Sequence, residues 1–179
     1  MEGKWEHDWR TTMMLQANPS NLGKIEPNIS HLTDILKPGD SLVDVGCGDG
    51  YLYDYLTRIG FRNNYTGIDR DRESIERARE RNKEVDYRIG ELKDLQGSWD
   101  VVFSSRVLIH IPDLEENIRI LRSCARKYCV LVLALGDDKT EWLEKSNCYF
   151  RFVSRETLKA FGDYEVKSHS PYCTVIYAS

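Results

Sequence analysis

The stretch LVDVGCGDGYL, residues 42–52, carries the strongest structural signal in this chain. Its first half is a short β-branched run that predicts a strand, and its second half opens a helix. Gly46, Gly48 and Gly50 alternate at the junction, where glycine permits positive φ and lets a ligand approach the backbone closely. Amide groups at the start of the following helix favour an anionic ligand group. The sequence therefore predicts a ligand site at a turn between a strand and a helix.

An acidic residue follows this glycine turn at the distance that nucleoside-binding folds use. Asp69 ends the next expected strand, residues 64–69, about twenty positions after the glycines, and a carboxylate there can accept both hydroxyls of a ribose. Asp69 could instead cap the helix expected at residues 72–83, although Asp71 is better placed for that role. Dinucleotide-binding turns read G-x-G-x-x-G, whereas this one reads D-x-G-x-G-x-G from Asp44. The spacing disfavours a nicotinamide cofactor.

The rest of the chain alternates strand and helix patterns, which is typical of a parallel α/β sheet. Asp113 with Glu116 is expected to cap one helix, and Ser154 a shorter one. The expected fold class is α/β, a doubly wound, mostly parallel sheet of seven strands whose last two are antiparallel. Besides the two strands above, the expected ones are 85–89, 99–105, 128–136, 164–170 and 172–178.

Composition limits the partners of the chain. The 179 residues include 25 Lys and Arg against 29 Asp and Glu, a net charge of −4, whereas nucleic-acid binders usually carry net positive charge. The longest strongly apolar run, residues 128–135, is far shorter than the roughly 20 residues that span a bilayer. No nucleic acid and no membrane are expected as partners. The first ten residues lack the apolar core of a secretory signal, so a cytoplasmic location is expected.

Five cysteines are present, an odd number, and no two form a C-x-x-C pair. This pattern argues against a disulfide framework and against a zinc site. Free thiols in a reducing compartment are expected, and no metal is expected.

The glycine turn resembles motif I of the class I S-adenosylmethionine-dependent methyltransferases, in which the helix terminus meets a methionine carboxylate. IGEL (89–92) and WDVVFSSRVLIHIPD (99–113) resemble the third- and fourth-strand motifs of the family's small-molecule branch. The resemblance covers roughly residues 40–136. It implies a Rossmann-like methyltransferase fold, S-adenosylmethionine as cofactor and a small-molecule methyl acceptor. The chain is interpreted as one domain, with an arm or lid and a helix in residues 1–40 and the methyltransferase domain in residues 41–179.

The resemblance also implies roles for single residues. Asp69 would bind the ribose and Arg70 would flank the adenine. Glu91 would reach the adenine amino group, Leu92 would pack on the ring, and Ser104 would lie beside the methionine part. Cys47 lies inside the turn as a small space-filling residue without a catalytic role. The expected cofactor-binding residues are Asp44, Gly46, Cys47, Gly48, Gly50, Asp69, Arg70, Glu91, Leu92 and Ser104.

Candidates on the acceptor side rest on position. His110 follows the fourth strand at the sheet edge that binds ligands; it is a candidate catalytic base or, alternatively, a packed, hydrogen-bonded residue. Arg106 could bind a carboxylate or phosphate of the substrate, or form a surface ion pair. Trp9 and Arg10 could close over the cofactor as a lid, or belong to a tail that makes no such contact. Trp142 is a further candidate for substrate binding.

The segment that carries Trp142, residues 137–152, leaves the fifth strand at the same sheet edge. It is expected to form another wall of the site, with part of it as a surface helix.

Two other function classes stay open. A nicotinamide-dependent oxidoreductase would share the sheet and the ribose carboxylate. A cofactor-binding subunit without catalysis, acting as a scaffold or activator, would keep every cofactor motif. Activity of the isolated chain on any acceptor would exclude this last possibility.

Overall fold

A computed structural model of the chain describes residues 22–61, 64–144, 148–169 and 172–179. The strands are β1 (Ser41–Val45), β2 (Asn64–Asp69), β3 (Asp86–Ile89), β4 (Trp99–Ser105), β5 (Ala125–Leu135), β6 (Lys139–Leu143), β7 (Cys148–Val153), β8 (Tyr164–His169) and β9 (Tyr172–Ala178). The helices are α2 (Leu22–Ile35), α3 (Tyr51–Arg58), α4 (Arg72–Arg81), α5 (Leu114–Ser123) and α6 (Arg155–Lys159), with a 3₁₀ turn η2 (Leu92–Asp94).

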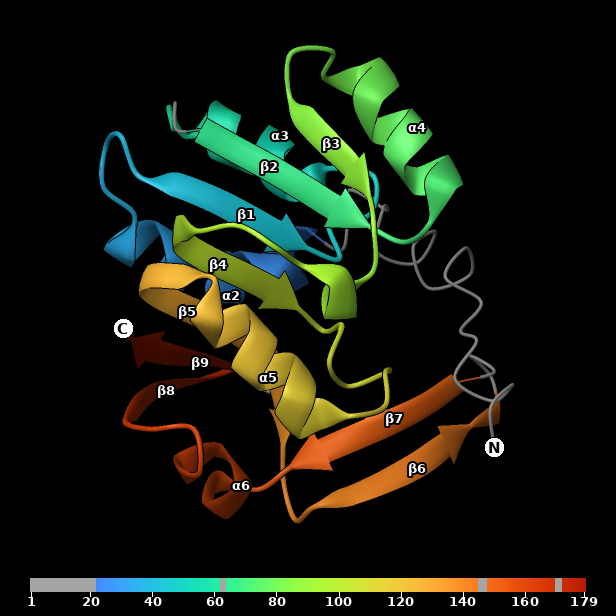
Figure 1. Ribbon diagram of the computed structural model, residues 1–179, viewed down its shortest axis with the longest axis vertical. Coiled ribbons are helices and arrows are strands. Elements are labelled where there is room, and N and C mark those ends of the chain that lie inside the picture. Colours follow the sequence, from blue (N-terminus) through green and yellow to red (C-terminus); the bar gives the residue numbers. More distant parts are fainter. Residues whose placement is uncertain (1–21, 62–63, 145–147, 170–171) are drawn as a thin grey trace.

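The sheet has the predicted α/β architecture. Strands β3, β2, β1, β4 and β5 are parallel neighbours in that order. β9 runs antiparallel to β5, and β8 runs antiparallel to β9 (Figure 1). These are the seven strands expected from the sequence. Because the five parallel strands run the same way, the carboxyl ends of β1, β2 and β4 meet at one edge, where such sheets bind ligands.

Two further strands correct the prediction for residues 137–152. β6 and β7 form an antiparallel hairpin. β7 continues the sheet by pairing in parallel with the end of β5, where Ala134 lies opposite Phe152. The expected surface helix is wrong, and the expected number of seven strands is too low for the described residues. The physical reason is twofold: CYFRFV is rich in residues that favour strands, and β5 extends far enough to offer an unpaired end.

Helices cover both faces of the sheet, so successive residues of a strand point alternately into two cores. Leu42 of β1 packs in one core with residues of α2, α3 and α4, whereas its neighbour Val43 packs in the other with residues of η2, α5 and α6. β5 follows the same rule, with Val130 in the first core and Leu131 in the second. Figure 1 shows α2 and α3 behind the sheet and α5 in front of it. A central strand covered on both faces is what the apolar run predicted.

Two of the three expected helix caps are present. The side chains of Asp71 and Ser154 accept hydrogen bonds from backbone amides in the first turns of α4 and α6. The predicted cap at Asp113 is wrong, because this residue has a left-handed backbone (φ 53°, ψ 45°) and makes no side-chain cap bond. The Asn117 side chain binds the Asp113 carbonyl oxygen instead, at 3.0 Å.

The first described helix belongs to the packed fold. α2 begins at Leu22, within the first forty residues where a helix is expected, and the Thr174 hydroxyl of β9 donates to the Asn28 side-chain oxygen at 3.0 Å. Leu32 of α2 is fully buried. Among the described helices, none has the length and apolar character needed to cross a membrane.

Candidate functional site

The glycine turn joins β1 to α3 in backbone conformations that favour glycine. Gly46, Gly48 and Gly50 have φ values of 81°, 54° and 79°. A Cβ atom on Gly46 would lie 2.0 Å from a methyl carbon of Val107, and one on Gly50 would lie 2.3 Å from the Tyr87 hydroxyl oxygen. The turn is therefore packed from two sides, and any larger residue at these two positions would force its neighbours to move.

Asp69 is hydrogen-bonded to the glycine turn. Its Oδ2 accepts from the Gly48 amide and its Oδ1 from the Asp71 amide, each at 2.9 Å. Burial raises the pKa of this carboxyl group, while the two amide hydrogen bonds oppose that shift. Each carboxylate oxygen keeps a second lone pair that can accept a hydroxyl proton. Asp69 and the turn thus form one ordered unit at the carboxyl ends of β1 and β2.

The side chains of Asp44, near the end of β1, and Cys47, within the turn, are both buried. The Asp44 side chain is buried and accepts a 2.7 Å hydrogen bond from the Tyr65 hydroxyl. Burial raises the pKa of Asp44 to about 7; the Tyr65 hydrogen bond opposes this rise and the Asp69 charge adds to it. Burial also raises the pKa of the Cys47 thiol, which packs in the core. Such a thiol is a poor nucleophile, in line with the expected space-filling role.

Arg77 clamps the glycine turn, a contact that sequence reasoning missed. Its Nε lies 3.1 Å from both carboxylate oxygens of Asp49, and its Nη2 lies 3.0 Å from Oδ1. Asp49 is buried inside the turn, whereas Arg77 comes from α4. The partners are 28 residues apart, so no local spacing signals the pair. A bidentate pair of this kind fixes both position and orientation.

The residues expected around the adenine and the methionine lie in different surroundings. Glu91 is exposed and pairs with Lys93 at 3.0 Å, and Arg70 is exposed beside Asp69. Leu92 is buried in the core under α5. Ser104 is 1% exposed, and its hydroxyl donates to the Val45 carbonyl oxygen at 3.0 Å. Ser104 therefore ties β4 to the end of β1.

Ile89 is a second residue that sequence reasoning missed. It ends β3 and is 39% exposed, although it is large and apolar. The next residue, Gly90, donates its amide to the Asp69 carbonyl oxygen at 3.0 Å, so this apolar surface lies close to Asp69. The available signal was its position at the end of a strand neighbouring the glycine turn.

His110 joins the loop after β4 to the hairpin. Its Nδ1 lies 2.9 Å from the Tyr149 carbonyl oxygen and 3.6 Å from the Cys148 sulfur. A carbonyl oxygen only accepts, so Nδ1 carries the proton and a neutral ring has its lone pair on Nε2. The ring is 8% exposed and stacks edge-on with Phe150, 5.8 Å between centroids. The packed, hydrogen-bonded role is thus present.

Arg106 and Trp142 differ in their surroundings. Arg106 follows β4 with a left-handed backbone, φ 62°, and its guanidinium carbon lies 5.5 Å from the centre of the Tyr172 ring. Trp142 of β6 is 41% exposed and packs edge-on against Tyr149 across the hairpin. The other two acceptor-side candidates, Trp9 and Arg10, lie outside the described residues.

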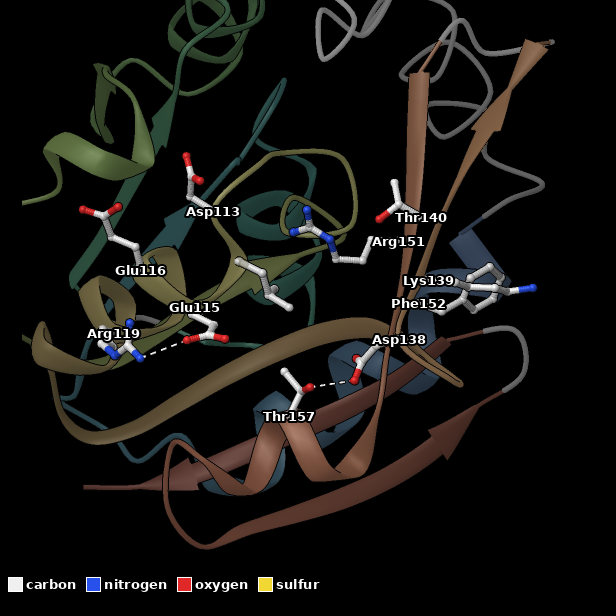
Figure 2. A pocket seen from close by; sticks show the side chains of 11 residues that line it. Asp113, Glu115, Glu116, Arg119, Asp138, Lys139, Thr140, Arg151, Phe152 and Thr157 are labelled. Atoms are coloured by element: carbon white, nitrogen blue, oxygen red, sulfur yellow. Dashed lines mark hydrogen bonds and ion pairs between the residues drawn. The ribbon is translucent and has the colours of Figure 1, made fainter. Parts of the chain in front are cut away.

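A pocket of about 710 Å³ lies between α5, α6 and the hairpin (Figure 2). None of the expected cofactor-binding residues lines it. Some of its charged side chains have protein partners: Arg119 pairs with Glu115 at 3.1 Å, and Asp138 accepts a hydrogen bond from Thr157 at 2.7 Å. Among the described residues, no three side chains of the metal-binding types cluster together. The glycine turn is therefore the better candidate for the functional centre.

Comparison with known proteins identifies the family. A family model described as a methyltransferase domain matches residues 19–161. This chain belongs to the methyltransferase domain family. The resemblance of the glycine turn and the later motifs to methyltransferases is thereby confirmed.

Curated relatives of the methyltransferase match over part of their length. Ubiquinone biosynthesis O-methyltransferase of Xanthomonas campestris pv. campestris (strain B100) is 32% identical over 129 residues, 68% of this chain and 49% of the relative. The protein of the same name from Idiomarina loihiensis is 32% identical over 130 residues, with the same shares. The chain spans about half the length of these relatives.

Solved structures agree with the fold of the methyltransferase. Magnesium protoporphyrin IX methyltransferase from Synechocystis PCC 6803 with bound SAM has a TM-score of 0.63 at 20% identity, covering 86% of this chain and 76% of that one. An S-adenosylmethionine-dependent methyltransferase from Mesorhizobium loti has a TM-score of 0.64 at 16% identity, covering 84% and 96%. These likenesses confirm the Rossmann-like methyltransferase fold.

The contact between Arg77 and the turn gives a first testable prediction for the methyltransferase. Arg77→Met keeps the apolar stem but frees the Asp49 carboxylate, so the turn loses its anchor on α4. We expect affinity for S-adenosylhomocysteine to fall by about three- to tenfold, roughly 0.7 to 1.4 kcal/mol, which is less than the loss of a direct charged hydrogen bond because Arg77 acts only through the turn. Arg81→Met is the matched control, because Arg81 ties α4 to Asp54 of α3 at 3.0 Å, outside the glycine turn. Calorimetric titration of both variants measures the difference, and equal affinities would contradict the clamp.

Proposed function

We propose that this methyltransferase transfers a methyl group from S-adenosylmethionine to a small-molecule acceptor. The observation that carries the proposal is the unit formed by the glycine turn and Asp69, joined by the bond from the Gly48 amide to the Asp69 carboxylate at 2.9 Å. It offers backbone amides at the start of α3 and a carboxylate with spare lone pairs at one sheet edge. Those donors and acceptors suit a molecule with a carboxylate at one end and a ribose at the other.

The residues present fit this cofactor. We propose that Asp69 accepts hydrogen bonds from the ribose hydroxyls, that Gly46, Gly48 and Gly50 shape the turn around the methionine carboxylate, and that Ile89 adds apolar surface beside the adenine. Arg70, Glu91 and Leu92 remain proposed neighbours of the adenine. The side chains of Asp44, Cys47 and Ser104 are buried, and we propose that they hold the turn in place from inside the protein.

S-adenosylmethionine supplies, when bound, a methyl carbon activated by a positively charged sulfur. The chain's own residues then have to hold the acceptor in line with that carbon and keep water away. We propose His110 as the base for a hydroxyl acceptor, because the Tyr149 carbonyl holds the Nδ1 proton and leaves Nε2 as the basic nitrogen. The curated relatives are named O-methyltransferases, which supports an oxygen acceptor for this chain.

Location and partners are part of the proposal. The five cysteines are free and buried, which suits the reducing cytoplasm. We propose a small-molecule acceptor, no nucleic acid and no membrane as partners. Residues 41–179 would form the catalytic domain with α2 packed onto it, and Trp9 and Arg10, which lie outside the described residues, are proposed to contact the acceptor.

Calorimetry with S-adenosylmethionine and S-adenosylhomocysteine tests the proposal. We expect both to bind with micromolar dissociation constants and NADH not to bind, since the turn has the methyltransferase spacing of glycines. Failure of both cofactor forms to bind at millimolar concentration would refute the proposed function.

A transfer assay separates an enzyme from a silent cofactor-binding subunit. The isolated chain is incubated with S-adenosylmethionine that carries a labelled methyl group and with a panel of hydroxylated small molecules. We expect label in at least one acceptor. If the isolated chain binds the cofactor but transfers no label to any acceptor, the result would favour the scaffold.

A further inference from the structure

The loop that follows β4 brings a cationic side chain to the edge of the proposed site. Val107 packs against the glycine turn, with a methyl carbon 2.0 Å from where a Cβ on Gly46 would lie. Arg106 immediately precedes it, and its amide still donates to the Val132 carbonyl oxygen of β5 at 3.0 Å. The Arg106 backbone is therefore fixed by the sheet on one side and lies one residue from the turn contact on the other.

Arg106 occupies a backbone conformation that an arginine rarely adopts. Its φ of 62° is in the left-handed region, where a side chain costs about 1 kcal/mol or more relative to glycine. The bond to Val132 uses only the backbone amide, which any residue other than proline supplies, whereas the guanidinium is hydrogen-bonded to the Tyr172 side chain. The strain therefore has to be offset by what the guanidinium does.

The guanidinium is partly buried without an opposite charge. Within the described residues no carboxylate pairs with Arg106, and its electrostatic partner is the Tyr172 side chain. Burial lowers the pKa of the guanidinium, which means that the charged form is poorly solvated where it stands. A poorly solvated cation gains more from an added anion than an exposed one does.

Aromatic rings lead from Arg106 to His110. The Tyr172 ring centroid lies 6.4 Å from that of Phe150, and the Phe150 centroid lies 5.8 Å from the His110 ring. An acceptor lying along these rings would meet the guanidinium at one end and the proposed base at the other.

We propose that Arg106 selects a methyl acceptor that carries an oxyanion, a carboxylate or a phosphate, on an apolar or aromatic body. The inference rests on the proposed function, because it names the class of acceptor for that same site. Arg106 is a specificity-determining residue in this account: it binds a part of the acceptor remote from the atom that receives the methyl group.

Three probes with the same phenyl body test the inference: benzoate, phenyl phosphate and uncharged benzamide. Each is titrated by calorimetry into the full chain saturated with S-adenosylhomocysteine. We expect at least one of the two anions to bind ten times more tightly than benzamide, and the tighter anion identifies the group. In Arg106→Met this preference should vanish, whereas in Arg106→Lys it should fall only by a few fold because the charge remains.

A matched control excludes a general effect of charge. Arg119 also lies over an aromatic ring, with its guanidinium carbon 5.5 Å from the centre of Phe161, but it lines the separate pocket beside α5. Arg119→Met should therefore keep the preference for the anion. Affinity for S-adenosylhomocysteine should stay within threefold of the parent in Arg106→Met, which shows that the variant is folded.

The outcomes separate this inference from the proposed function. If S-adenosylhomocysteine binds but neither anion is preferred over benzamide, the inference is overturned and the proposed function stands. If the preference persists in Arg106→Met, the anion binds elsewhere and the inference is also overturned. If the parent chain fails to bind S-adenosylhomocysteine, the proposed function itself is refuted, and the inference falls with it.

Discussion

Asp69→Ala is expected to weaken the binding of S-adenosylhomocysteine by about 2 kcal/mol or more, roughly thirtyfold, because charge-assisted hydrogen bonds to the ribose are lost. The structure strengthens the reason for this expectation. Both carboxylate oxygens are already oriented by the amides of Gly48 and Asp71, so the remaining lone pairs need no reorganisation to receive two hydroxyls. Calorimetry at constant pH measures the change.

A ligand that lacks the two ribose hydroxyls distinguishes a direct contact from a loosened turn. The parent chain should bind the dideoxy form of S-adenosylhomocysteine far more weakly than the normal form. Asp69→Ala should bind the two forms almost equally, because the partner of the hydroxyls is already absent. If the variant still prefers the normal ligand by the same factor as the parent, Asp69 acts only through the shape of the turn.

The core of the fold was predictable because its signals are local. The β-branched run before Gly46, the alternating glycines and the apolar run of β5 each occupy a few consecutive residues. Each of these patterns predicts a specific part of a parallel sheet. Asp71 and Ser154 cap their helices for the same reason: the cap and the amide that it binds are three residues apart.

The features that escaped prediction depend on distant parts of the chain or on backbone geometry. Residues 148–153 favour a strand locally, but they form β7 of this sheet only because the end of β5 is free to pair with them. The local sequence does not reveal that free end. Asp113 fails as a cap because its own backbone lies in the left-handed region, which the residue type does not reveal. The first outcome follows from a tertiary contact, and the second from a backbone conformation.

The candidate site divides in the same way. Gly46, Gly48, Gly50 and Asp69 follow from spacing alone, and the structure joins them into one unit. The clamp from Arg77 to Asp49 requires α4 to pack beside the turn, so an arginine in a run of charges gave no sign of it. The packing of the helices decides whether a charged side chain contacts the site or only faces solvent.

Asp44→Asn is expected to change how the stability of the protein depends on pH. Burial raises the pKa of Asp44 in the folded chain from 3.8 to about 7. A carboxyl group whose pKa is raised on folding contributes stability that is present below the unfolded pKa and is lost as pH rises through the folded pKa. The window is thus about pH 4 to 7, and the loss has an upper limit of about 4 kcal/mol, since one pKa unit corresponds to about 1.4 kcal/mol.

The asparagine variant keeps an oxygen for the Tyr65 hydroxyl but has no proton to lose. At pH 4, the lower end of that window, its free energy of unfolding in urea should lie within about 1 kcal/mol of the parent value, the usual size of a change in one neutral hydrogen bond. At pH 8 the variant should be the more stable protein, because the parent then holds a buried negative charge near Asp69. Asp100→Asn supplies the contrast: hydrogen bonds from Arg126 lower the pKa of Asp100, so that carboxylate stabilises the fold at neutral pH and loses its effect in acid. Parallel stability curves for the parent and Asp44→Asn between pH 5 and 8 would mean that Asp44 is already charged in the folded protein, and that the turn above it tolerates a buried anion.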